Sequence, residues 1–324
     1  SIHIRDAKLG AAAHGYDALM ASIRPTEKLP GKKAAIIGGG PTGIAAAYFL
    51  ARGGVQTTIF EREEKLGGVP RYVIPAFRIS DETLDKDVAL MERLGVEVKC
   101  GAPAPSVAEL KKMGYTHILL ATGAWQAGEL GIPGNVRGVI AWMKEMKQQV
   151  KPCLEGHVVV VGAGNTAMDA ARVAKRMGAA SSTIVYRRTK KEMPADEHEL
   201  KLAIDECVNL VELAAPVEQK DGRLICNQMK LGEPDASGRR SPVATGETFE
   251  IPCDLVLSAI GEKVDAKLMA ENGIEMGRKG PAFQTNVENV WSAGDAHRGP
   301  ATVVAGIADA AAFAEAVIGE APTY

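Results

Sequence analysis

Two glycine-rich turns, 124 positions apart, constrain the fold of this chain more than any other feature. They are Gly38-Gly39-Gly40-Pro41-Thr42-Gly43 and Gly162-Ala163-Gly164-Asn165-Thr166-Ala167. Each follows an apolar run of strand type and opens an apolar stretch of helical type. In this context the glycines permit a tight turn and let a pyrophosphate approach the free N–H groups at the helix start. The repeat predicts two tandem, doubly wound α/β domains of Rossmann type.

The strand that follows the first turn is expected at Val55–Phe60 and ends in an acid, Glu61, 23 residues after Gly38. A carboxylate at this position can accept hydrogen bonds from ribose hydroxyls and would repel a 2′-phosphate. The alternative is a solvated charge within the run Glu61–Lys65.

The second turn is followed by a strand that ends in bases, Tyr186-Arg187-Arg188, with Arg187 25 residues after Gly162. Two guanidinium groups offer paired donors to a phosphate dianion, which favours NADPH over NADH at this site. The alternative is a solvated basic turn that also includes Lys190 and Lys191.

A third element lies near the end of the chain. Ala293-Gly294-Asp295 follows the expected strand Val290–Ser292 and precedes a long helix expected from Thr302 to Ile318. Asp295 could bind a polyol such as ribitol, or could serve as a turn or capping residue. The amides near Thr302, Val303 and Val304 could stabilise negative charge on a reduced flavin.

Further elements are expected from periodicity and turn residues. They are a short helix at Ala11–Ile23, helices at Ser80–Leu94 and Lys190–Cys207, and several strands over residues 210–257 with a polar turn at Glu233–Arg240.

Composition excludes several classes of function. The 324-residue chain has a net charge of −2, so no basic field indicates nucleic acid or an anionic membrane. The uncharged run Ala34–Ala51 contains the glycines of the first turn and is therefore not expected to span a membrane. The five cysteines are at least 19 residues apart, which argues against a disulfide reductase and against a metal or iron–sulfur site within this chain. Free thiols, together with the absence of a visible signal peptide, favour the cytoplasm.

From about Pro30 to Ile318 these features resemble the small-subunit type of glutamate synthase. This family of flavoproteins with two dinucleotide sites includes the amino-terminal half of dihydropyrimidine dehydrogenase and proteins assigned as selenate-reductase subunits. The most specific pieces are Glu63–Gly68, Arg71–Arg78, Gly164–Asp169, Val185–Arg188, Ala259–Gly261 and Ala293–Asp295. Leu231–Asp235 and Gly294–Pro300 are most similar to the selenate-reductase type.

The resemblance implies an enzyme that passes hydride from NADPH to FAD. The residues expected to contact FAD are Gly38, Gly40, Pro41, Thr42, Gly43, Glu61, Arg62, Gly67, Gly68, Arg71, Ala121, Thr122, Gly123, Gly294, Asp295, Thr302 and Val303. Those expected to contact NADPH are Gly162, Gly164, Asn165, Thr166, Arg187, Arg188, Ala259 and Gly261. No general acid or base is expected, and His297 and Arg298 are interpreted as loop residues beside the flavin.

The resemblance also implies how the chain is divided. An N-terminal helical segment is expected at 1–29 and an FAD-binding domain at 30–127 and 259–324. The NAD(P)H-binding domain is expected as an insertion at 128–258, with hinges near Gly128–Pro133 and Ala259–Gly261.

Full-length members of the family carry a cysteine-rich iron–sulfur segment before the FAD domain. An iron–sulfur domain or subunit is therefore expected upstream or in trans. Two alternatives remain: a stand-alone reductase of the ferredoxin–NADP type, and a nucleotide-stabilised docking module for a larger redox subunit.

Overall fold

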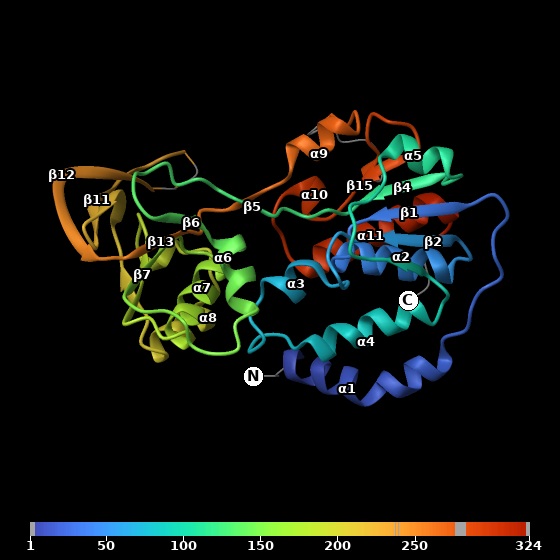
Figure 1. Ribbon diagram of the computed structural model, residues 1–324, viewed down its shortest axis with the longest axis horizontal. Coiled ribbons are helices and arrows are strands. Elements are labelled where there is room, and N and C mark those ends of the chain that lie inside the picture. The colour runs from blue at the N-terminus through green and yellow to red at the C-terminus, as the bar shows by residue number, and fades with distance from the viewer. Residues whose placement is uncertain (1–3, 237, 239, 276–282, 322–324) are drawn as a thin grey trace. The chain divides into compact units, whose positions relative to one another are not determined.

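A computed structural model describes residues 4–236, 238, 240–275 and 283–321 (Figure 1). The chain forms two compact units. Unit 1 comprises Ser1–Arg71, Ser80–Gly123 and Asp265–Tyr324, and unit 2 comprises Tyr72–Ile79 and Ala124–Val264. The domain ranges expected from the sequence placed 72–79 in the first nucleotide domain, whereas its contacts place it in unit 2.

Unit 1 is built on a parallel sheet in the order β15-β4-β1-β2-β3. Its strands are β1 (Lys33–Ile37), β2 (Gln56–Phe60), β3 (Glu97–Lys99), β4 (His117–Leu120) and β15 (Val290–Ser292). β1 and β2 are almost wholly buried, as their continuous apolar runs predict for a sheet covered on both faces. The strand order reverses at β1, between β2 and β4. This is the switch point at which open α/β sheets bind ligands.

The helices of unit 1 bring two N-termini to one edge of this sheet. They are α1 (Ile4–Ser22), α2 (Pro41–Arg52), α3 (Gly68–Tyr72, whose last residue belongs to unit 2), α4 (Asp81–Glu92), α5 (Val107–Lys112), α9 (Ala266–Glu271), α10 (Asp295–Arg298) and α11 (Val303–Ile318). Gly306 of α11 faces Thr42 near the start of α2, and Ile318 faces Gly53 just beyond its end. α2 and α11 therefore run parallel. Since α2 and α11 follow β1 and β15, both helices begin at the carboxyl edge of the sheet.

Unit 2 contains a second parallel sheet, in the order β6-β13-β7-β8-β9. Its strands are β6 (Val136–Gly138), β7 (His157–Val161), β8 (Ser181–Val185), β9 (Asn209–Val211) and β13 (Leu255–Ser258). An antiparallel sheet follows, of β10 (Ala214–Lys220), β11 (Arg223–Pro234) and β12 (Arg240–Pro252), and β5 (Gln126–Ala127) pairs with β14 (Glu262–Lys263). The two parallel sheets confirm the predicted fold class, with paired Rossmann-like units.

The helices of unit 2 are α6 (Val139–Lys147), α7 (Asn165–Arg176) and α8 (Glu197–Asp205). The single helix expected over Lys190–Cys207 is wrong. A short 3₁₀ turn, η1 (Lys190–Glu192), is separated from α8 by Met193 and Pro194. Pro194 disfavours a helical conformation at Met193, whose ψ of 130° is extended, and Asp196 caps the new helix.

Candidate functional site

The first glycine turn lies at the switch point of the sheet in unit 1. Gly38 has φ +108°, and a Cβ there would overlap the carbonyl of Ala121 at the end of β4. A Cβ at Gly43 would overlap the carbonyl of Gly38. Gly40 is the N-cap residue of α2 and has no side chain to cap it, so the helix start is left open to a ligand.

Glu61 lies at the edge of this turn and also stabilises it. The carboxylate is 6% exposed and accepts the N–H of Gly39 at 2.7 Å and the N–H of Glu63 at 2.9 Å. The reading of Glu61 as a freely solvated charge is therefore wrong. Its neighbour Arg62 has a side chain that is 54% exposed and lies 3.7 Å from Glu63.

The Gly67–Gly68 loop packs on the same turn. Gly67 donates its N–H to Gly39 at 2.7 Å, and a Cβ on Gly68 would lie 2.8 Å from Cα of Gly40. Arg71, expected at the cofactor, supports this loop: its Nε donates to the carbonyl of Leu66, and its Nη2 lies 2.5 Å from Asp85. The local sequence did not indicate this supporting role, because Asp85 lies on the next helix, α4, 14 residues further along the chain.

The strand ends beside the turn offer further groups. Thr122 follows β4, and its Oγ1 is buried without a hydrogen-bond partner among the described residues. Gly123 has φ +71°. Val303 and Val304, at the start of α11, are 48% and 74% exposed. An unpartnered hydroxyl and exposed valines at one sheet edge suit a ligand with both polar and apolar parts.

The Ala293–Asp295 turn is fixed by a buried acid that the sequence reading missed. Asp309 on α11 is 2% exposed and accepts the N–H of Gly294 and Nε of Arg298, each at 2.9 Å. Asp295 accepts the N–H of Ala301 at 3.1 Å, which shows a turn-holding role for this carboxylate. Thr302 caps α11 by accepting the N–H of Ala305.

The residues beside this motif have structural partners. Arg298 is paired with Asp309, and the ring of His297 meets that of Phe283 edge-on at 4.9 Å. These contacts agree with their interpretation as loop residues.

The second glycine turn has the same construction in unit 2. Gly162 has φ +152°, and a Cβ there would overlap the carbonyl of Ala259, just after β13. Gly164 caps α7, and a Cβ on it would meet open space. Asn165 accepts the N–H of Asp196 at 3.0 Å, so its side chain also fixes the start of α8.

The structure separates the two arginines that follow β8. Arg187 is exposed, whereas Arg188 is 9% exposed and its Nε has no hydrogen-bond partner among the described residues. A buried guanidinium with an unused donor is costly unless a ligand supplies the acceptor. This pair therefore fits an anionic ligand.

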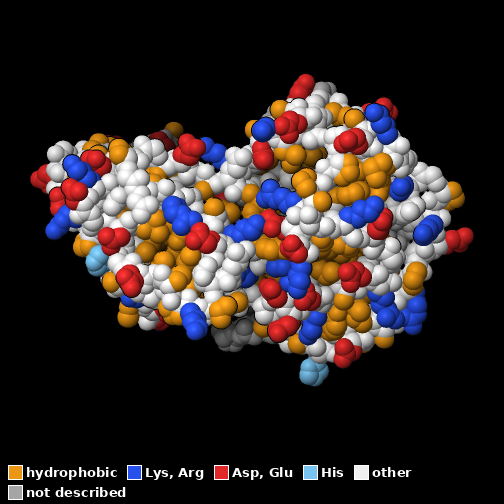
Figure 2. Space-filling model, in the orientation of Figure 1, with side chains coloured by type: hydrophobic (Ala, Val, Ile, Leu, Met, Phe, Trp, Pro, Cys, Tyr) orange, Lys and Arg blue, Asp and Glu red, His pale blue; other side chains and the backbone are white. Residues whose placement is uncertain are grey.

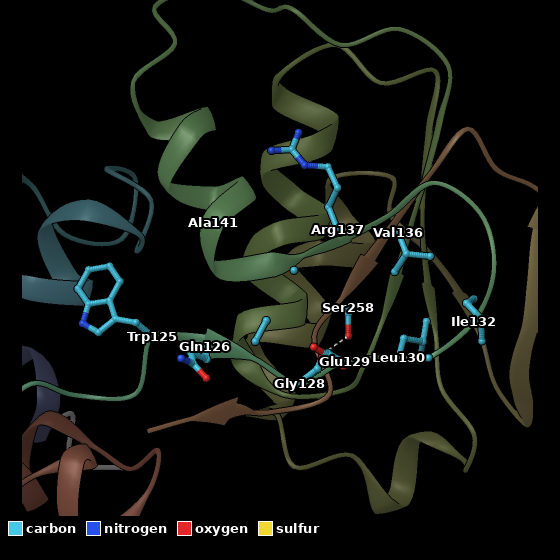
Figure 3. Close-up of a pocket in the computed structure, with 13 residues that line it drawn as sticks. Trp125, Gln126, Gly128, Glu129, Leu130, Ile132, Val136, Arg137, Ala141 and Ser258 are labelled. Atoms are coloured by element: carbon cyan, nitrogen blue, oxygen red, sulfur yellow. Dashed lines mark hydrogen bonds between the residues drawn. The ribbon is translucent and has the colours of Figure 1, made fainter. Parts of the chain in front are cut away.

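The two expected hinges are joined to each other as a ribbon. Gly128 donates its N–H to Gly261 at 2.6 Å and accepts the hydroxyl of Ser258 at 2.6 Å, and β5 pairs antiparallel with β14. Thr166 of α7 donates to Glu262 of β14 at 3.1 Å. The adjacent cleft has a volume of about 520 Å³. In Figure 3 the hydroxyl of Ser258 points toward Gly128, and the side chains of Leu130, Ile132 and Val136 lie along one side of the cleft.

The cysteines show no redox arrangement within the described part of the chain. All five are free thiols, and burial raises the pKa of Cys226 and Cys253 to about 12. No group of three or more potential metal ligands occurs among the described residues. No described helix has the length and apolar character required to cross a bilayer.

Comparison with known proteins adds the family. The profile of the pyridine nucleotide-disulphide oxidoreductase family matches residues 32–310. The YgfK protein of Escherichia coli strain K12 is 37% identical over 98% of this chain, but the match covers only 32% of YgfK. The glutamate synthase [NADPH] small chain of Halomonas elongata is 32% identical over 95% of this chain and 71% of its own length. These relatives confirm the resemblance found in the sequence.

A solved structure agrees with the fold. FprA of Mycobacterium tuberculosis, in complex with NADPH, matches with a TM-score of 0.75 and 19% identity. The match covers 91% of this chain and 84% of FprA. At this identity, the likeness shows the shared two-domain architecture.

Proposed function

The chain belongs to the pyridine nucleotide-disulphide oxidoreductase family, and on that premise we propose that it is an FAD-dependent NADPH oxidoreductase that delivers electrons to an iron–sulfur partner. One observation carries this proposal. Two glycine turns occupy the switch points of two parallel sheets, and one is edged by a carboxylate and the other by two guanidinium groups.

FAD fits the first turn. The open N-terminus of α2 suits the pyrophosphate, and Glu61 suits the adenosine ribose. The unpartnered hydroxyl of Thr122 and the exposed valines at the start of α11 provide the mixed surface that a flavin needs. The residues assigned to FAD from the sequence are retained in this proposal, with Arg71 as a support of the Gly67–Gly68 loop.

NADPH fits the second turn. Arg188 has a buried donor without a partner, and Arg187 stands exposed beside it, so a 2′-phosphate would satisfy both. Gly164 leaves the backbone open at the start of α7. The carbonyl of Ala259 packs against Gly162, and Gly261 lies in the ribbon that follows.

When bound, the nucleotides supply the chemistry: hydride is exchanged between nicotinamide and flavin, and the reduced flavin can release electrons singly. The side chains described here contribute positioning and electrostatics. The N–H groups at the start of α11 can stabilise negative charge, because the helix dipole is positive at that end. No general acid or base is assigned.

The electrons then need an acceptor. The described residues hold no cluster of metal ligands and no C-x-x-C pair, so we assign the acceptor to an iron–sulfur domain or subunit outside this chain. The relative from Halomonas elongata is named as the small chain of a larger enzyme, which supports this arrangement. The free thiols are consistent with a cytoplasmic location.

The test is to measure bound FAD in the purified chain and then to add NADPH without oxygen. The proposal predicts FAD close to one equivalent, and loss of the visible absorption band of the oxidised flavin on adding NADPH. A colourless protein, or a flavin that NADPH does not bleach, would instead indicate a docking module. Addition of a ferredoxin to the reduced protein then separates a stand-alone ferredoxin reductase from an enzyme that needs its own iron–sulfur partner.

A further inference from the structure

The segment Tyr72–Ile79 has no role in the site described above, although it includes most of the motif Arg71–Arg78. It leaves unit 1 directly after Arg71 and returns to it at Ser80, but it packs within unit 2. Residues of α6, α7 and α8 hold it there. We call this set of contacts the 72–79 clasp.

Arg78 provides the electrostatic part of the clasp. Its Nη1 donates to Asp169 of α7 at 2.8 Å, and its Nη2 lies 3.1 Å from Glu199 of α8. Both carboxylates belong to residues that are only 6% exposed. Burial raises the pKa of Asp169, and the hydrogen bond from Arg78 counters that effect. Loss of Arg78 would remove the ion-pair partner of the buried Asp169. Glu199 would retain its ion pair with Arg172, at 3.6 Å.

Phe77 provides the second contact. Two guanidinium groups of α7 lie over its ring, that of Arg172 at 4.4 Å and that of Arg176 at 4.0 Å from the ring centroid. Glu206 accepts hydrogen bonds from both arginines, which lowers its pKa to about 2. Phe77 is 36% exposed, so cation–π attraction contributes to its position beside partial burial.

The backbone of the segment is tied as well. Lys147, at the end of α6, donates from Nζ to the carbonyl of Ile74 at 2.6 Å. Side chains from three helices of unit 2 therefore hold one eight-residue segment. A segment that only connected two parts of the chain would not need these contacts.

The clasp is connected to both nucleotide sites, through the chain on one side and through α7 on the other. Residue 72 directly follows Arg71, which supports the Gly67–Gly68 loop at the first site. On the other side, α7 begins at Asn165 in the second glycine turn and carries Asp169, Arg172 and Arg176 along the same helix. α7 is a helix of 12 residues and therefore a stiff element. A displacement of its first turn would also displace the side chains of α7 that contact segment 72–79.

We propose that the 72–79 clasp couples the two nucleotide sites: NADPH at the start of α7 tightens segment 72–79, and the segment in turn positions Arg71 and the Gly67–Gly68 loop for hydride transfer. Arg78 is the main positioning residue of this link. The inference rests on the proposed function for its kinetic part, whereas the fastening of the segment to α7 is independent of it.

The first measurement is amide hydrogen exchange over residues 72–79, with and without NADP⁺ as the probe. In the wild-type protein, NADP⁺ should slow the exchange. Arg78→Gln should speed the exchange and abolish the response to NADP⁺, and Arg78→Lys should restore part of it. Phe77→Leu should weaken the response without leaving a buried charge unpaired. Arg223→Gln is the matched control, since Arg223 forms an exposed ion pair with Glu250 at 3.2 Å on the hairpin.

The second measurement is the limiting rate of flavin reduction by NADPH under anaerobic conditions. Arg78→Gln should lower this rate by roughly tenfold or more, because small misplacements of reacting groups are costly. FAD content should stay at the wild-type value, whereas the Kd for NADP⁺ should rise, because a segment that NADP⁺ tightens must in return favour NADP⁺ binding.

An unchanged limiting rate in a variant whose segment exchanges faster would overturn the proposal. So would wild-type exchange that does not respond to bound NADP⁺. A wild-type protein without FAD would refute the proposed function, yet the difference in exchange between wild type and Arg78→Gln would still report whether Arg78 fastens the segment.

Discussion

The contrast between Glu61 and the Arg187–Arg188 pair separates the two nucleotide sites at the level of single residues. Glu61 is buried and accepts two backbone N–H groups, so its charge is fixed at the edge of the first turn. A 2′-phosphate at that position would meet a carboxylate of like charge. The second turn presents the opposite charge.

The two arginines are expected to contribute unequally. Arg187→Ala should raise KM for NADPH about tenfold or more and leave KM for NADH nearly unchanged, since a charge-assisted hydrogen bond contributes roughly 1.5–3 kcal/mol. Arg188→Ala should show the same preference together with lower stability, because Arg188 is buried. Steady-state kinetics with both nucleotides gives the answer. Lys191→Ala, in the exposed turn nearby, is the control, and equal effects of Arg187→Ala on the two nucleotides would refute a phosphate contact.

The residues of the glycine turns could be predicted from the sequence, whereas stabilising contacts between residues far apart in the chain could not. Gly38 and Gly162 were identified because a strand–turn–helix with no room for a Cβ leaves a local signature. Asp309 was missed because its partners, Gly294 and Arg298, lie 15 and 11 residues earlier in the chain and meet it only in the folded unit. Arg71 and Asn165 were predicted as cofactor contacts, and the structure shows a supporting contact for each.

At the level of elements, the central strands and their following helices were predicted closely, because each combines a continuous apolar run with a glycine turn. The strand expected at Val55–Phe60 agrees with β2 to within one residue, and the final helix begins within one residue of its expected start. The break at Met193-Pro194 was missed, because the amphipathic pattern continues across it. α6 was also missed, since it follows a short edge strand without a glycine turn.

The joint between α11 and the Ala293–Asp295 turn gives an element-level prediction. Asp309→Asn should destabilise unit 1 by roughly 1–3 kcal/mol, because the buried acid loses its charge-assisted hydrogen bonds to the partly exposed Arg298. It should also lower FAD content, since the amide offers one acceptor oxygen where the carboxylate offers two to Gly294 and Arg298. Urea denaturation and the ratio of flavin to protein measure the two effects. Glu315→Gln, at an exposed position of the same helix, should change neither, and full flavin content in Asp309→Asn would separate this joint from the flavin site.

For the whole molecule, the points at which the chain passes between its two units are more informative about function than the distribution of surface charge. Figure 2 shows acidic and basic side chains interspersed over the visible face, in keeping with a net charge of −2. The chain passes between its two units at residues 71/72, 79/80, 123/124 and 264/265. Passages near the last two were anticipated from the family resemblance, which implied hinges near Gly128–Pro133 and Ala259–Gly261. The first two could not be, because no local pattern in Tyr72–Ile79 indicates which unit will hold its side chains.

The most direct test of the account is an experimental structure of the chain crystallised with FAD and NADP⁺ together. We predict FAD at the Gly38 turn with its adenosine ribose on Glu61, and NADP⁺ at the Gly162 turn with its 2′-phosphate between Arg187 and Arg188. The same nucleotide in both sites, or NADP⁺ at the Gly38 turn, would contradict the account.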